Sequence, residues 1–244
     1  MSHSNRDKLF AQPMDVVSDF TFDQSVAEVF QDMAQRSIPG YQAIIHHTGE
    51  LAARFVQKDT NCYDLGCSLG ASTLSVRQRV EGRDVTLYAV DNSRAMLEKC
   101  AANLASEPST TRIELVHEDI CKVEINNASL VIMNFTLQFI PLQQRTALLT
   151  NIYAGLNPGG CLVVSEKLHF EPASLNHLLN ELHHQFKREQ GYSDLEISQK
   201  RDSIENVLVP ETLETHISRL QSCGFKTVSP WFQCFNFGSL VAIK

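Results

Sequence analysis

The sequence lacks long apolar runs. No stretch of its 244 residues approaches the ~18 consecutive apolar residues that a membrane-spanning helix needs. Residues 1–10 are polar and have no apolar segment of the kind found in secretory signal peptides. We therefore expect a cytoplasmic protein without a membrane partner.

Runs of basic residues are also absent. The 21 Lys and Arg residues face 28 Asp and Glu residues, which gives a formal net charge of −7. A protein that binds nucleic acid extensively needs a stripe of cations to neutralise phosphates, and no such stripe is visible here. Direct nucleic-acid binding is therefore not expected.

Cys-x-x-Cys pairs are missing as well, although there are 7 cysteines. An odd number without close pairs predicts neither a disulfide framework nor a zinc site. His183 and His184, with His177 and Glu181 nearby, do not change this, because neighbouring residues on a helix point in different directions. We expect reduced thiols, no metal, and a structural role for this helix.

The composition is that of an ordinary globular protein, with 43% hydrophobic and 20% charged residues. A chain of this length buries about three quarters of its extended surface on folding. A single domain spanning residues 1–244 is therefore expected, with a core that needs no staple.

Strand and helix patterns alternate along the middle of the chain. Helical spacing over 44–55 belongs to an N-terminal helical extension, 1–57. Short apolar runs predict buried strands at 62–65, 85–90, 113–116, 130–133 and 161–164. Helices are expected at 72–80, after the capping residue Ser93, and at 142–156, with a turn at 157–160. This alternation predicts a parallel sheet with helices on both faces.

The C-terminal part continues with a helical insertion, 172–209, containing helices at 175–187 and 195–207. A helix at 212–223 and two strands at 231–235 and 237–243 follow, and the strands are close enough to form an antiparallel hairpin. The whole pattern resembles the Rossmann-like class I methyltransferase fold. We therefore predict an α/β fold with a mostly parallel seven-stranded sheet, an antiparallel C-terminal hairpin and added N-terminal helices.

A loop with two glycines follows the first predicted strand. Gly66 and Gly70 allow a tight turn, but Ser68 occupies the position where a dinucleotide-binding loop has its second glycine. The loop therefore suits a ligand that has no phosphate but has an ammonium group, and S-adenosylmethionine is such a ligand. The alternative is a loop that needs its glycines only to turn.

Two carboxylates follow the next strands. Asp91 ends the second predicted strand, where a carboxylate can accept hydrogen bonds from both ribose hydroxyls. Asp119 and Ile120 follow the third, where they would contact adenine. The alternatives are that Asp91 caps the next helix and that Asp119 is a solvated loop residue. Taken with the glycine loop, the nucleoside-binding interpretation is favoured.

Asn134 and Cys67 are further candidates near the ligand. Asn134 ends the fourth strand, but Phe135 follows it in place of the prolines found in enzymes that methylate base amino groups. It either faces the cofactor or bonds local backbone. Cys67 has no neighbour that would lower its thiol pKa, so we treat it as a backbone contact.

Longer strings of sequence are more specific than these single residues. Over nearly its whole length the chain resembles the carboxy-S-adenosyl-L-methionine synthase family, whose members act in tRNA wobble-uridine modification. The strings are 26–30 (VAEVF), 35–41 (QRSIPGY), 63–70 (YDLGCSLG), 134–139 (NFTLQF), 191–193 (GYS), 195–201 (LEISQKR) and 231–240 (WFQCFNFGSL). The departures are Ile38, where the family favours Val, and Glu189-Gln190, where it favours Ala-Asn. Both are conservative or outside the expected pocket.

The resemblance implies a homodimer that converts S-adenosylmethionine and prephenate to carboxy-S-adenosylmethionine and phenylpyruvate. The product would serve a tRNA uridine carboxymethyltransferase, a possible further partner. Arg201 would reach in from the partner subunit to bind the new carboxylate, with the insertion 172–209 at the dimer interface; Arg36 and Arg201 are also candidates for contacting prephenate. The residues implied to contact the cofactor are Tyr41, Gly66, Cys67, Ser68, Asp91, Asn92, Asp119, Ile120, Asn134 and Arg201.

Two other functions fit the same residues. One is an ordinary methyltransferase acting on a small molecule or on tRNA. The other is a non-catalytic subunit that binds S-adenosylmethionine for a tRNA-modifying partner.

Overall fold

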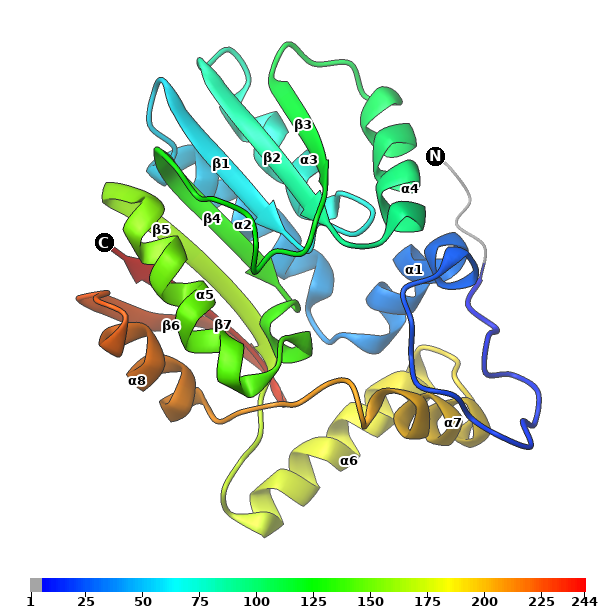
Figure 1. Ribbon diagram of the computed structural model, residues 1–244. Coiled ribbons are helices and arrows are strands. Elements are labelled where there is room, and N and C mark those ends of the chain that lie inside the picture. Colours follow the sequence, from blue (N-terminus) through cyan, green and yellow to red (C-terminus); the bar gives the residue numbers. More distant parts are fainter. Residues whose placement is uncertain (1–5) are drawn as a thin grey trace.

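A computed structural model describes residues 6–244; residues 1–5 of the expected polar start lie outside this range. Over the described residues, seven strands form one sheet in the order β3-β2-β1-β4-β5-β7-β6 (Figure 1). β1 to β5 pair in parallel, whereas β7 is antiparallel to both β5 and β6. This confirms the predicted α/β fold. The strands are β1 (Thr60–Leu65), β2 (Val85–Asp91), β3 (Arg112–His117), β4 (Ala128–Asn134), β5 (Leu156–Lys167), β6 (Thr227–Cys234) and β7 (Phe237–Ile243).

Helices cover both faces of the sheet, and some of them extend beyond the ends of its strands. In Figure 1, α1, α6 and α7 lie together beyond the carboxyl ends of the parallel strands. None of the helices within residues 6–244 is long and apolar enough to cross a membrane. The helices are α1 (Gln24–Ser37), α2 (Tyr41–Phe55), α3 (Ala71–Val80), α4 (Arg94–Ala105), α5 (Leu142–Gly155), α6 (Ala173–Glu189), α7 (Asp194–Ile204) and α8 (Leu213–Ser222), with a 3-10 turn, η1, at Leu137–Phe139.

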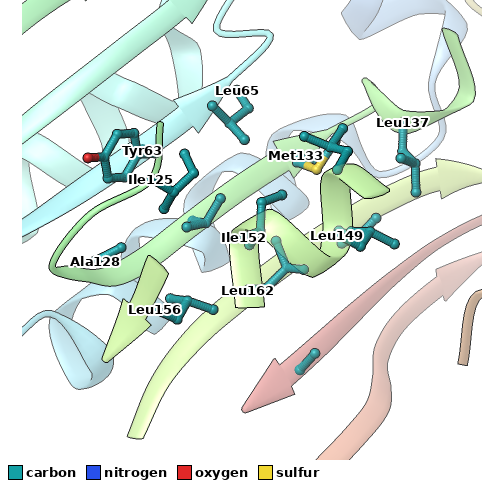
Figure 2. Close-up of a cluster of buried hydrophobic side chains, with 14 of the residues drawn as sticks. Tyr63, Leu65, Ile125, Ala128, Met133, Leu137, Leu149, Ile152, Leu156 and Leu162 are labelled. Atoms are coloured by element: carbon teal, nitrogen blue, oxygen red, sulfur yellow. The ribbon is translucent and has the colours of Figure 1, made fainter. Parts of the chain in front are cut away.

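The core lies on both sides of the sheet because side chains alternate along each strand. On β4, Val131 and Met133 join the cluster that α5 and α8 cover, and Figure 2 shows Met133 in that cluster. Leu130 and Ile132 point to the other face, where residues of α2 and α3 pack. A strand that is apolar on both faces is typical of a sheet covered on both sides. The two layers hold the carboxyl ends of the strands in place.

Several element boundaries differ from the prediction, and three of these differences have a clear structural reason. Residues 157–160, expected as a turn, belong to β5. Gly159 N donates to Lys244 O, and Lys244 N donates to Gly160 O, so this segment pairs with the residue that follows β7. The helix expected to reach residue 207 ends at Ile204, where Val207 N turns back to donate to Ile204 O. β6 begins at Thr227, four residues early, and includes Pro230; an edge strand tolerates proline.

Candidate active site

A cavity of about 380 Å³ opens at the carboxyl ends of the parallel strands. β1 lies between β2 and β4, so the strand order reverses there, which is where ligands bind in open α/β sheets. Most of the sequence-predicted contacts line this one cavity: Tyr41, Gly66, Cys67, Ser68, Asp91, Asn92, Asp119, Ile120 and Asn134. Arg201 is not among the lining residues; it lies on α7, with its guanidinium on Asp202 and its side chain 57% exposed.

The loop after β1 is held tightly by backbone hydrogen bonds. Gly66 N and Cys67 N both donate to Val90 O, at 2.8 and 2.9 Å, and Gly70 N donates to Cys67 O at 2.8 Å. Gly66 has a φ of 80°, and a Cβ there would lie 2.4 Å from Thr136 Oγ1. Only glycine fits this position, so the loop backbone can approach a ligand closely.

Asp91 joins the loop to the next helix. Its Oδ2 accepts from Ser68 N at 2.9 Å, and its Oδ1 accepts from Ser93 N at 2.8 Å. The side-chain N-cap of α4 is Ser93, as predicted, so Asp91 braces the capping residue and does not itself cap the helix. Burial raises the pKa of Asp91, although the backbone N–H donors oppose that shift. A carboxylate has about four acceptor positions, so two remain available to a ligand.

The residues after β3 and β2 form the neighbouring part of the lining. Asp119 is half-buried and its Oδ1 accepts from Cys121 N at 2.9 Å. Ile120 is buried and packs into the main hydrophobic cluster. Asn92 O is 3.1 Å from His117 Nε2, which ties the end of β2 to the end of β3. This end of the cavity therefore offers one carboxylate beside one apolar side chain.

Asn134 is fixed by side chains from three different elements. Its Nδ2 donates to Ser72 Oγ at 2.9 Å and to Thr48 Oγ1 at 3.3 Å, and its Oδ1 accepts from Ser165 Oγ at 2.7 Å. The alternative in which Asn134 bonds local backbone is therefore not what its amide does. Asn134 is therefore held in place at the carboxyl end of β4, a central strand that lies between β1 and β5.

Two further groups beside the loop have raised pKa values. Burial raises the pKa of Asp64 to about 6, opposed by the Thr73 hydroxyl, which donates to Asp64 Oδ2 at 2.6 Å. Burial, followed by the nearby Asp64 carboxylate, also raises the pKa of the Tyr41 phenol. The phenol remains protonated at neutral pH and can donate a hydrogen bond into the cavity.

Cys67 is a poor candidate for a nucleophile. Its side chain is buried, and the contact with Cys100, followed by burial, raises the pKa of its thiol well above the usual value. All seven cysteines fall in the described range and are free thiols. Within residues 6–244, no group of three or more His, Cys, Asp or Glu side chains could hold a metal ion.

Sequence reasoning missed three lysines and a histidine that line the same cavity. They are Lys167 at the end of β5, His183 and Lys187 on α6, and Lys200 on α7. His183 is 4% exposed, which is compatible with the structural role expected of its helix, and Lys200, whose spacing in the sequence gives no reason to place it in a site, is 8% exposed. The four-residue spacing of His183 and Lys187, which places both on one helix face, was the only available signal.

Aromatic side chains complete the lining. Phe22 lies in the segment before α1, and its ring packs edge-to-face against the rings of Phe20 and Phe139. The ring centroids are 5.2 Å apart in both pairs. Phe135, with a φ of 61°, has its ring 6.3 Å from that of Tyr41. These rings make much of the wall apolar and limit the access of water.

Comparisons with known proteins agree with this geometry. Residues 62–160 match the family model of a methyltransferase domain. Human N-acetylserotonin methyltransferase, solved with S-adenosylmethionine, superposes with a TM-score of 0.61 at 18% identity, covering 99% of this chain and 63% of that one, which shows a shared fold. The carboxy-S-adenosyl-L-methionine synthase of Shewanella oneidensis is 54% identical over 99% of this chain and 100% of its own length. That of Salmonella arizonae is 55% identical, covering 99% and 98%. The protein therefore belongs to the carboxy-S-adenosyl-L-methionine synthase family.

Proposed function

We propose that this protein converts S-adenosylmethionine and prephenate to carboxy-S-adenosylmethionine and phenylpyruvate. The observation that carries the proposal is one cavity that joins a set of residues suited to a nucleoside, at the ends of β1 to β3, to lysines from β5, α6 and α7. The relatives at 54% and 55% identity are named for the same product. The product would supply 5-oxyacetyl modification of a tRNA wobble uridine.

The lining residues support a specific placement of S-adenosylmethionine. The two open acceptor positions of Asp91 would take the ribose hydroxyls, and Asp119 with Ile120 would take adenine. The sulfonium would then lie over β1 and β4, beside Tyr41 and Asn134. Carbonyl oxygens of the glycine loop would accept from the ligand's ammonium group.

The proposed reaction balances without a side-chain base. Prephenate loses carbon dioxide and hydroxide, which leaves phenylpyruvate. The hydroxide removes a proton from the sulfonium methyl group to give water and an ylide, and the ylide carbon then forms a bond to carbon dioxide. An ylide in bulk water would be reprotonated, so the aromatic wall with Phe22 and Phe139 matters for the outcome.

We further propose that the enzyme is a homodimer in which Arg201 serves the partner's cavity. Leu175, Leu178 and Leu182 recur at helical spacing on α6 and are 39%, 53% and 37% exposed. An exposed apolar face of this kind is typical of an interface. The nearby Arg201 is available, and its planar fork can pair with the new carboxylate through two hydrogen bonds.

We also propose a partner and a location for the enzyme. A tRNA uridine carboxymethyltransferase would consume the product. The net charge of −7 argues against direct nucleic-acid binding by this chain. We place the enzyme in the cytoplasm as a single domain of residues 1–244.

Purified protein incubated with S-adenosylmethionine and prephenate tests the function. The expected result is a nucleoside heavier by carbon dioxide, formed in equal amount to phenylpyruvate and only when both substrates are present. Liquid chromatography with mass spectrometry measures both products. S-adenosylhomocysteine with a methylated acceptor would instead identify an ordinary methyltransferase, and tight nucleoside binding without turnover would identify a binding subunit.

A further inference from the structure

Three lysine side chains in the cavity lining, two of them buried, lie close enough together to repel one another. Lys187 and Lys200 are each 8% exposed, and Lys167 is half-buried at the end of β5. Burying an ammonium group costs several kcal/mol unless an anion or hydrogen bonds compensate. Three lysines that line one cavity therefore need compensating interactions.

Ser37 fixes the position of this group. Lys200 Nζ donates to Ser37 Oγ at 3.0 Å, and His183 Nε2 lies 2.8 Å from Ser37 O. A carbonyl oxygen only accepts, so His183 carries its proton on Nε2 and presents Nδ1 as an acceptor. Lys187 follows His183 by one helical turn and so lies on the same face of α6.

Hydrogen-bond partners for these ammonium groups are scarce. Over residues 6–244, Lys167 Nζ and Lys187 Nζ make no hydrogen bond or ion pair, and Lys200 Nζ has Ser37 alone, which leaves most of its donors open. The only carboxylates among the described lining residues are Asp91 and Asp119, at the far end. From β2 to β5 is three strand spacings, or about 14 Å. Neither carboxylate can neutralise the cations.

Four acidic side chains outside the cavity lining interact with these lysines or with their neighbours. The charge of Asp7 opposes the lowering of the pKa of Lys187 and Lys200. Asp7 Oδ2 also accepts from the Tyr192 hydroxyl at 2.6 Å. Asp32 pairs with Arg36 at 3.0 Å. The charge of Glu205 opposes the lowering of the pKa of Lys167. Glu181 Oε1 lies 3.5 Å from His184 Nδ1. None of these four acids is among the described lining residues, so the lysines have no carboxylate partner on the cavity surface beside them.

The lysine pKa values agree with this picture. Burial lowers the pKa of Lys200 to about 8. Burial, followed by Lys200 and Lys167, lowers the pKa of Lys187 well below its usual value. The same repulsion that lowers these values would be relieved by a bound anion.

We propose that Lys167, Lys187 and Lys200 form a subsite that holds the two carboxylates of a dicarboxylate second substrate. This inference rests on the proposed function for the identity of that substrate, prephenate, which has two carboxylates where phenylpyruvate has one. Lys167 lies at the end of β5, on the opposite side of β1 from Asp91 at the end of β2, so the subsite is separate from the site proposed for the ribose. It acts within one chain, unlike Arg201.

Calorimetry on Lys187→Met and Lys167→Met tests the inference. Both variants remove the charge and keep most of the chain length, and Lys226→Met, at an exposed position between α8 and β6, is the matched control. Prephenate and phenylpyruvate are titrated separately into protein saturated with S-adenosylhomocysteine, which lacks the methyl group and so prevents turnover. We expect prephenate affinity to fall about tenfold or more in each cavity variant, as for loss of a charge-assisted pair. Phenylpyruvate affinity should fall less, and the control should match the wild type.

S-adenosylhomocysteine affinity and thermal stability show whether each variant is folded. Both should stay at wild-type values or, for stability, rise, because a buried charge has been removed. A loss of S-adenosylhomocysteine affinity would assign the lysines to the amino-acid end of the nucleoside and overturn the inference. Unchanged prephenate affinity in both variants, or no binding of prephenate to the wild type, would also overturn it.

The activity assay separates this inference from the proposed function. Lysine-dependent prephenate binding without a carboxylated nucleoside would support the subsite and reject the proposed reaction. A carboxylated nucleoside made by both variants with the wild-type KM for prephenate would support the reaction and reject the subsite.

Discussion

Asp91→Ala is expected to weaken S-adenosylmethionine binding about 100-fold, as the loss of two charge-assisted hydrogen bonds of about 1.5 kcal/mol each predicts. The carboxylate would lose its bonds to the ribose hydroxyls. It would also release Ser68 N and Ser93 N, which it holds at 2.9 and 2.8 Å, so the glycine loop would loosen. Isothermal titration calorimetry measures the change directly.

The control for this variant is Asp84→Ala. Asp84 precedes β2, its carboxylate is exposed, and it lies 3.6 Å from Lys58 on the surface. Its removal should leave nucleoside affinity unchanged. If Asp91→Ala bound S-adenosylmethionine as tightly as the control, the assignment of Asp91 to the ribose would be wrong.

Arg145→Met is expected to destabilise the protein by about 3 to 5 kcal/mol, the usual cost of breaking a buried charged network. Arg145 is fully buried on α5 and pairs with Glu211. It also donates to the carbonyls of Gln138, Ile140 and Val209 at 3.1, 2.9 and 2.9 Å. Methionine would leave the carbonyls of Ile140 and Val209 without this donor, whereas Gln138 O would keep only its bond from Val209 N. For a chain of this size the melting temperature should fall by roughly 10 °C.

The same variant should also affect ligand binding, because Gln138 and Ile140 line the cavity. Arg112→Met is the matched control: its side chain is 71% exposed and pairs with Glu114 on the surface. An exposed ion pair contributes little to stability, so the control should melt close to the wild type. Equal melting temperatures for the two variants would show that the Arg145 network does not hold the 138–140 and 209–211 segments together.

That Gly66, Asp91 and Asp119 meet in one cavity could be predicted from sequence because it depends on local order along the chain. Each lies at or just after the end of a strand, and parallel strands bring their carboxyl ends to the same side of the sheet. The hydrophobic runs identified those strands without any structural information. Residues that share such an edge are close in space even when far apart in the sequence.

The cationic end could not be predicted because it depends on contacts between distant segments. Lys200 meets Ser37, 163 residues away, and Tyr192 meets Asp7 across 185 residues. No periodic pattern encodes how α6 and α7 fold back over the sheet edge. A lysine on a helix is usually solvated, so its burial here appears only when the packing is known.

Crystals grown with S-adenosylmethionine test the central claim most directly. The account predicts electron density for the nucleoside in the cavity over β1 to β3, with both ribose hydroxyls at Asp91, adenine beside Ile120 and the methyl group directed toward β5. A cavity that stays empty at saturating ligand, or a nucleoside bound at another place, would contradict it.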